Sequence, residues 1–460
     1  MGLLDSLQMG RKGLSAATAG INVVSNNVAN ANTVGYSRRN LTTQNSDPIF
    51  QQGVLFGQGV DITGIVRAHD RYLGMQLVDA VGLQSRASTA EESLKLTEAY
   101  FNESETAGLV EVYGAYYDAF NQLSSDPSDI SLRSHAVQTS ERLATSVSRV
   151  ADGLQDNINN FDDGFSAKFS QLNGLLSQIA KLNAAIGKRG DLQGNTELLD
   201  RRDQLVREVA ALMGASAELD PSGQATIYID GHAVVSGGEA RTLSLITAAG
   251  VPPVLYLAAD AGLIDVTSGV GGELGGILDA RSYTQGYLNR LDDFAFTFAN
   301  SMNAIHVGGF DNYGAAGGNL FVPPAAIAGA ASTLSVDPLV SADPNLLAMA
   351  GAAGAAGDDT NLQNILTFES SASFTGALTG LQFLSSIVND VGGDVAAVSA
   401  DVEAQDALVE DYDAMRTSIS GVDTDEEAVR LIEYQAAYRA AAKIVSATDE
   451  MLRVLTTLGG

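Results

Sequence analysis

Two heptad stripes, one at each end of the chain, constrain the fold more than any other feature of the sequence. Near the N-terminus, apolar or small residues recur every seven positions in two rows: Leu7, Leu14, Ile21 and Val28, and Leu3, Gly10, Ala17, Val24 and Ala31. Near the C-terminus the rows are Leu431, Tyr438, Val445 and Leu452, and Tyr434, Ala441, Thr448 and Leu455. Such narrow stripes are typical of coiled-coil helices. Because neither stripe can be buried alone, we expect residues 1–40 and 421–460 to pair.

The N-terminal helix is predicted to be weak on its own. Its second half is rich in asparagine, which is a poor helix former because its side chain competes for backbone hydrogen bonds. An isolated helix of this kind is marginal in water. We therefore expect it to become ordered only on assembly.

The C-terminal helix is predicted to begin with a capping box. Thr424 and Glu427 have the spacing at which each side chain satisfies the backbone amide of the other residue. Three carboxylates in this first turn also face the positive end of the helix dipole. Residues 1–40 are basic and residues 421–460 are acidic, so charge adds modestly to the expected pairing of the two ends.

The middle of the chain is predicted to be a helical rod. Apolar residues recur at the three- and four-residue spacing of amphipathic helices along residues 143–186, 196–213, 287–305 and 381–415. Between residues 214 and 269 the period changes to two, with turn sequences between short strands. The predicted fold is therefore mainly α with one inserted small β domain, in which long helices form a rod and the terminal helices pair as a coiled coil.

This pattern divides the chain into three predicted domains. The terminal coiled-coil domain comprises residues 1–40 and 421–460. The helical rod domain, which includes short strands, comprises residues 41–213 and 270–420. The β domain comprises residues 214–269.

Composition narrows the possible partners. The 460 residues include 26 Lys and Arg against 55 Asp and Glu, a net charge of −29, which argues against nucleic acid or an anionic membrane as a partner. The chain has no cysteine, so disulfides and thiolate metal sites are excluded. Neither a cleavable signal peptide nor an apolar run of membrane-spanning length is evident. We expect a cytoplasmic protein or one exported without a cleaved signal.

No pattern predicts a catalytic, cofactor or metal site. The four histidines are scattered without metal-ligand spacing. The carboxylates of Asp200-Arg201-Arg202-Asp203 point around a helix and are interpreted as a solvated, salt-bridged face. The glycine-rich residues 269–276 lack the Lys-Ser/Thr ending of a phosphate loop and are interpreted as the linker out of the β domain.

Two terminal motifs resemble the signatures of a known family. They are INVVSNNVANANTVGYSR at residues 21–38 and DEEAVRLIEYQAAY at residues 425–438. Both resemble the terminal signatures of the bacterial flagellar axial proteins, which are the rod, hook and junction subunits. Interior stretches resemble the junction subunits in particular: IAKLNAAI at 179–186, LDRRDQL at 199–205 and GELGGIL at 272–278.

This resemblance implies a structural adaptor that catalyses no reaction and uses no cofactor. It implies export without a cleaved signal peptide, an extracellular place in the flagellum, and a ring of identical subunits. The implied partners are the hook protein, the next junction protein on the filament side and a flagellar export chaperone that binds the C-terminal helix. The expected assembly interface consists of Leu7, Leu14, Ile21, Val24, Val28, Asn30, Asn32, Gly35, Tyr36, Leu431, Tyr434, Tyr438, Val445 and Leu452.

Two alternatives stay open at this point. One is another axial subunit, such as a distal-rod or hook protein, although the long helix at residues 143–186 disfavours it because those subunits are richer in β structure. The other is a secreted flagellum-associated hydrolase. That enzyme would need convergent acid and base groups, and the sequence shows no such constellation.

Overall fold

The computed structural model describes residues 2–51, 54–101, 108–189, 195–248, 250–259 and 262–458. Its helices are α1 (Leu3–Ala29), α2 (Arg71–Glu98), α3 (Leu109–Leu123), α4 (Ile130–Arg189), α5 (Thr196–Met213), α6 (Gly272–Val307), α7 (Pro338–Ala342), α8 (Thr360–Glu369), α9 (Gly380–Ser420) and α10 (Thr424–Leu458). Its strands are β1 (Arg39–Asn45), β2 (Ile49–Gln51), β3 (Val54–Phe56), β4 (Val60–Arg67), β5 (Ser216–Leu219), β6 (Ala225–Ile229), β7 (His232–Ser236), β8 (Glu239–Ala240), β9 (Leu243–Ala248), β10 (Val251–Ala259) and β11 (Gly262–Asp265). Short 3-10 turns lie at Ala99–Phe101, Thr267–Gly269 and Pro344–Leu346.

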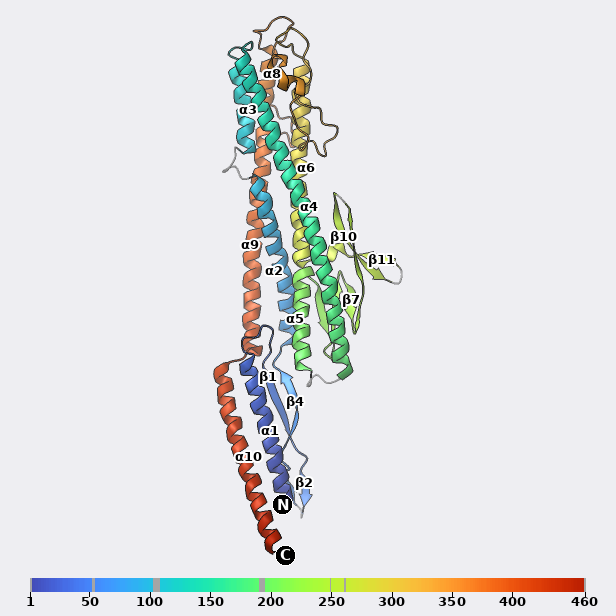
Figure 1. Cartoon of the computed structure of the whole chain (residues 1–460), viewed down its shortest axis with the longest axis vertical. Coiled ribbons are helices and arrows are strands. Elements are labelled where there is room, and N and C mark those ends of the chain that lie inside the picture. Colours follow the sequence, from blue (N-terminus) through green and yellow to red (C-terminus); the bar gives the residue numbers. More distant parts are fainter. Residues whose placement is uncertain are drawn as a thin grey trace.

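These elements form a long rod with both chain ends at one end of it (Figure 1). There α1 and α10 lie side by side, and β1 and β4 pack on α1; we call these elements, with β2 and β3, the terminal unit. The helix α4 has 60 residues, or about 90 Å at 1.5 Å per residue. The predicted fold class, mainly α with paired terminal helices, a long-helix rod and an inserted β domain, is confirmed.

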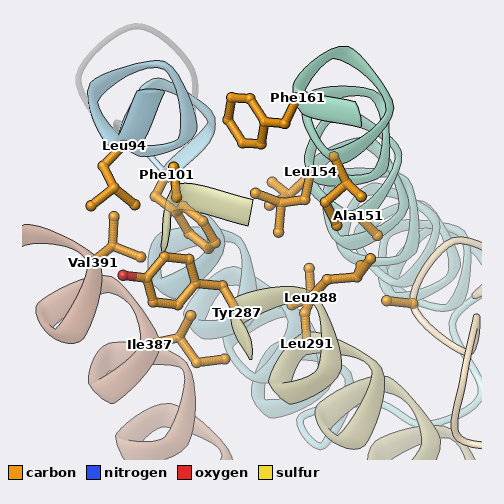
Figure 2. Packing of buried hydrophobic residues seen from close by; sticks show 14 of the residues in the cluster. Leu94, Phe101, Ala151, Leu154, Phe161, Tyr287, Leu288, Leu291, Ile387 and Val391 are labelled. Carbon is orange, nitrogen blue, oxygen red and sulfur yellow. The ribbon is translucent and has the colours of Figure 1, made fainter. Parts of the chain in front are cut away.

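The apolar core lies inside the rod, where four helices meet (Figure 2). Leu94 of α2, Leu154 of α4, Leu291 of α6 and Val391 of α9 converge there, and each is at most 1% exposed. Apolar residues three and four positions apart place such side chains on one face of each helix. Among the described residues, this core cluster includes none from α1 or α10. The terminal helices are therefore packed separately from the rod.

The β domain consists of two antiparallel sheets that contact α4. One sheet has the order β5-β6-β7-β8, and the other has the order β11-β10-β9. Asn183 of α4 anchors the first sheet, because its Nδ2 donates to the carbonyl oxygens of Ala225 at 2.7 Å and Gly237 at 2.9 Å. Its Oδ1 accepts from the Ala225 amide at 2.9 Å. Buried residues of both sheets belong to the same core as the rod helices.

The glycine-rich stretch at residues 269–276 is not simply a linker. The helix α6 already begins at Gly272, so the linker interpretation is wrong from that residue onward. A Cβ on Gly276 would lie 2.4 Å from the carbonyl oxygen of Arg86 on α2. Glycine is therefore required here because the backbones of two helices approach closely, not because the chain turns.

Buried polar side chains of α6 hold the long span at residues 308–359. His306 is 0% exposed, and its Nε2 accepts a hydrogen bond from the Ala348 amide at 2.9 Å. Nδ1 therefore carries the ring proton and donates to the carbonyl oxygen of Gly318 at 2.7 Å. Asn303, one turn earlier, is also buried and hydrogen-bonded to this span. One helix thus fixes a span of low regularity through its polar groups.

Candidate assembly site at the terminal helices

Small residues on α1 allow α10 to pack closely against it. A Cβ on Gly10 would lie 2.7 Å from Cγ2 of Val445. A Cβ on Gly20 would lie 2.4 Å from the ring of Tyr434, so neither position has room for a methyl group unless its neighbour moves. We call this contact the terminal seam. On α1 it follows Gly10, Gly13, Ala17, Gly20, Val24 and Asn27.

The seam on α1 is rotated relative to the predicted one. Val24 is 2% exposed and lies in it. Leu7, Leu14 and Ile21 are only half-buried, and Val28 is 46% exposed. The predicted row that contains Gly10, Ala17 and Val24 does lie in the seam, whereas the row of large apolar residues does not. Glycine instead permits the closest approach of the two helices.

On α10 the predicted stripe mostly faces α1, with two exceptions, Tyr438 and the 55% exposed Leu455. Leu431, Tyr434, Val445 and Leu452 are half-buried, whereas Tyr438 is 43% exposed. Helical spacing gives α10 a second apolar set directed away from the seam. Its members are between 52% and 63% exposed: Val429, Ile432, Met451 and Val454. Ile444 is 49% exposed but borders the seam, since its Cγ2 would lie 3.4 Å from a Cβ on Gly10.

The turn after α1 is shaped by two of the predicted site residues. Gly35 has a φ of +83°, a left-handed conformation that glycine adopts without strain. The Tyr36 hydroxyl donates to Oδ1 of Asn27 at 2.8 Å, and the Arg39 guanidinium lies over its ring, 5.0 Å from the centroid. Gly35 and Tyr36 thus shape the turn within a single folded chain, without a contact to another copy. The other predicted residues of this turn are half-buried and exposed, respectively: Asn30 and Asn32.

Asn27 and Glu427 form a buried polar contact that was not predicted as part of the site. Both are 0% exposed, and Nδ2 of Asn27 donates to Oε2 of Glu427 and to the carbonyl oxygen of Arg39, each at 2.9 Å. Glu427 is therefore not in a capping box; the Asp423 carboxylate caps α10 instead, accepting from the Asp425 amide at 2.9 Å. The sequence carries one signal for this contact, which is an asparagine on the seam. A buried amide at such a position can fix the register of two helices.

A buried ion-pair network joins the terminal unit to the rod. Arg67 of β4 donates to Asp200 and Asp203 of α5, each at 2.8 Å, and Arg39 lies 3.7 Å from Asp200. Arg202 is 1% exposed, so the interpretation of this stretch as a solvated face is wrong. Burial raises the pKa of Asp200. Burial would also raise the pKa of Asp203, but Arg202 and Arg67 beside it hold that pKa below its usual value.

The chemistry of this end is that of packing and hydrogen bonding. Within the described ranges, no group of three His, Cys, Asp or Glu residues is placed to hold a metal ion. No helix in that part of the chain is long and apolar enough to cross a membrane. A close-packed helix pair, a buried amide–carboxylate contact and an exposed apolar face are features that suit assembly with other proteins.

Comparison with known proteins matches both ends and the middle of the chain. A family model for flagella basal body rod protein matches residues 7–36, and one for the C-terminal region of flagellar basal body rod FlgEFG proteins matches residues 416–458. A model for the helical domain of flagellar hook-associated protein FlgK matches residues 94–321. The paired termini and the long-helix rod thus define the class as the flagellar rod and hook proteins.

Curated relatives narrow the class to one family. Flagellar hook-associated protein 1 of Escherichia coli (strain K12) is 25% identical over 97% of this chain and 98% of its own length. That of Bacillus subtilis (strain 168) is 26% identical over 98% of each. The flagellar hook junction protein FlgK from Burkholderia pseudomallei has the same fold, with a TM-score of 0.67 at 16% identity, over 75% of this chain and 100% of that one. The chain belongs to the family of flagellar hook-associated protein 1.

Proposed function

We propose that the chain assembles through its terminal unit, and that it serves in this way as a structural adaptor between the flagellar hook and filament. The observation that carries this proposal is the exposed apolar face of α10, opposite the terminal seam. A single folded chain leaves the four large apolar side chains of this face of α10 more than half exposed, and exposed apolar surface can mark an interaction site. Copies of the chain in a closed ring would cover it.

The predicted interface residues divide between two roles in this proposal. Val28 and Tyr438, which are 46% and 43% exposed, are available to a neighbouring copy. Gly35 and Tyr36 act from within the chain by fixing the turn that follows α1. The half-buried residues at the edge of the seam pack partly within the chain and are partly available to a neighbouring copy.

The partners we propose are other copies of this chain, the hook protein and the next junction protein on the filament side. An export chaperone would bind α10 before assembly, through Leu431, Tyr434, Tyr438 and Val445. Because α1 packs against most of these residues in the folded chain, the chaperone would bind before α1 is in place. The same proposal places the protein outside the cell, after export without a cleaved signal. It also holds that the protein catalyses no reaction.

Substitutions on the exposed face of α10 test the proposal. Ile432→Asp and Met451→Asp place a charge on side chains that are 63% and 55% exposed, so the free energy of unfolding should change by less than about 0.5 kcal/mol. In cells that lack the native gene, each variant should leave hooks without filaments. Glu433→Gln, an exposed polar change on the same helix, is the control and should restore filaments.

Two outcomes would count against this function. Normal filaments in cells carrying either aspartate variant would exclude assembly through this face. Cell-wall hydrolysis by the purified protein, abolished by a single carboxylate substitution, would favour the hydrolase instead.

A further inference from the structure

A small cavity lies where the terminal unit meets the rod. Its volume is about 40 Å³, room for roughly three water molecules or one small ion of similar size. The turn after α1, the segment before α2, and the helices α5 and α9 all contribute to its wall. The lining residues used below are Gly35, His69, Asp203, Arg207 and Arg416.

Arg207 brings to this cavity a guanidinium that has carboxylates nearby but no direct partner among the described residues. Its Nη2 lies 3.2 Å from the position that a Cβ on Gly35 would occupy. Among the described residues, none forms a hydrogen bond or an ion pair with the Arg207 guanidinium. Burial and the nearby charge of Arg416 lower the pKa of Arg207, while the carboxylates of Asp203, Asp413 and Asp200 partly offset this; arginine stays protonated in proteins.

The other polar groups of the cavity do not pair directly with the Arg207 guanidinium. Asp203 is already engaged by Arg67 and Arg202. Arg416 pairs with Asp413 on its own helix at 2.9 Å and presents a second guanidinium to the same space. Nε2 of His69 is buried and has no hydrogen-bond partner. The cavity therefore combines two guanidinium groups with one carboxylate, Asp203, which Arg67 and Arg202 already engage.

We infer that this cavity binds one small oxyanion of the carboxylate or phosphate class. Arg207 and Arg416 are both half-buried, and the planar set of donors of a guanidinium matches the oxygens of a carboxylate or phosphate. An anion between Arg207 of α5 and Arg416 of α9 would also lie against the Gly35 turn. It would thus tie the terminal unit to the rod. This site is independent of the proposed assembly through α10.

The site can be tested by measuring the thermal unfolding midpoint of the full-length chain. The midpoint in inorganic phosphate or acetate is compared with that in chloride at matched ionic strength. At least one oxyanion should raise the midpoint above that in chloride, and the increase should grow with the logarithm of its concentration once this exceeds Kd. Arg207→Gln should weaken the apparent affinity about tenfold or more, because it removes charge-assisted hydrogen bonds. Arg201→Gln, an exposed position on the same helix, is the matched control and should behave as the wild type does.

The outcomes separate the two sources of the anion. A rise in midpoint with phosphate that Arg207→Gln reduces supports a free phosphate-class ligand, whereas such a rise with acetate alone supports a carboxylate such as an acidic side chain. If Arg207→Gln does not fold, Arg416→Gln serves as the second variant and should also weaken binding. Equal midpoints in all three salts, or an increase that survives both substitutions, would overturn the inference.

Discussion

At Gly20, a Cβ would lie 2.4 Å from the ring of Tyr434, so Gly20→Val forces the two terminal helices apart. Overpacking of this kind typically costs about 1–3 kcal/mol. We expect faster proteolysis within α1 and α10, while the helices of the rod keep their stability. Ser15→Val, on the exposed side of α1, is the control for β-branching and should leave the proteolysis rate unchanged. A wild-type rate for Gly20→Val would show that the seam is looser than described.

The Asn27 side chain forms hydrogen bonds with several backbone and side-chain groups at once, so replacing it with alanine should be destabilising. Asn27→Ala leaves the buried Glu427 carboxylate and the Tyr36 hydroxyl without this partner. An unsatisfied buried polar group costs about 1–3 kcal/mol. Chemical denaturation should show this loss, whereas Asn32→Ala, at an exposed position, should change stability by less than about 0.5 kcal/mol. Equal effects from the two substitutions would contradict the assigned role of Asn27.

His306 should make stability depend on pH. Burial lowers its pKa in the folded chain below the usual 6.5, so the unfolded chain binds the proton more readily. Its contribution is therefore complete above about pH 6.5 and is lost as the pH falls below that value. His306→Gln, which can still donate and accept, should flatten the unfolding free energy between pH 5 and 7 as measured by denaturant titration (roughly the histidine range). The exposed His135→Gln should keep the wild-type slope.

At the scale of elements, periodicity predicted the helices well but not how they face each other. The predicted helix at residues 196–213 coincides with α5, because its apolar spacing and its ends are local signals. On α1 the predicted row with Gly10, Ala17 and Val24 lies in the seam, but Gly20 was missed, since glycine carries no hydrophobic signal and acts through close approach to another helix. The buried ion pair of Asp203 was also missed, because it too depends on a residue far away in the sequence. Its partner Arg67 is distant in sequence, and pairing over such separations has no local pattern.

The start of α10 offers a direct test of two capping schemes. The Asp423 carboxylate accepts hydrogen bonds from the amides of Asp425 and Glu426. Asp423→Ala should therefore destabilise the terminal unit by about 1 kcal/mol, as measured by chemical denaturation. Thr424→Ala should have a much smaller effect. A larger loss of stability for Thr424→Ala than for Asp423→Ala would instead support the capping box formed by Thr424 and Glu427.

At the scale of the whole molecule, the rod should fold without the terminal helices. The described core cluster includes no residue of α1 or α10, so a chain of residues 37–420 keeps all of it. We expect one cooperative unfolding transition by calorimetry, with a midpoint within about 5 °C of the rod transition in the full chain. A broad, non-cooperative transition would mean that the terminal helices are needed to complete the rod.

The connection between these two parts has a consequence for how the molecule carries force. The backbone passes between the terminal unit and the rod twice, at residues 68–70 and 421–423, and the two links lie at the same level of the molecule (Figure 1). The ion pairs of Arg67 with Asp200 and Asp203 bridge the same narrow zone. Tension applied along the molecule would be concentrated at this neck. It would yield there, by swivelling or opening, before the long helices begin to unwind.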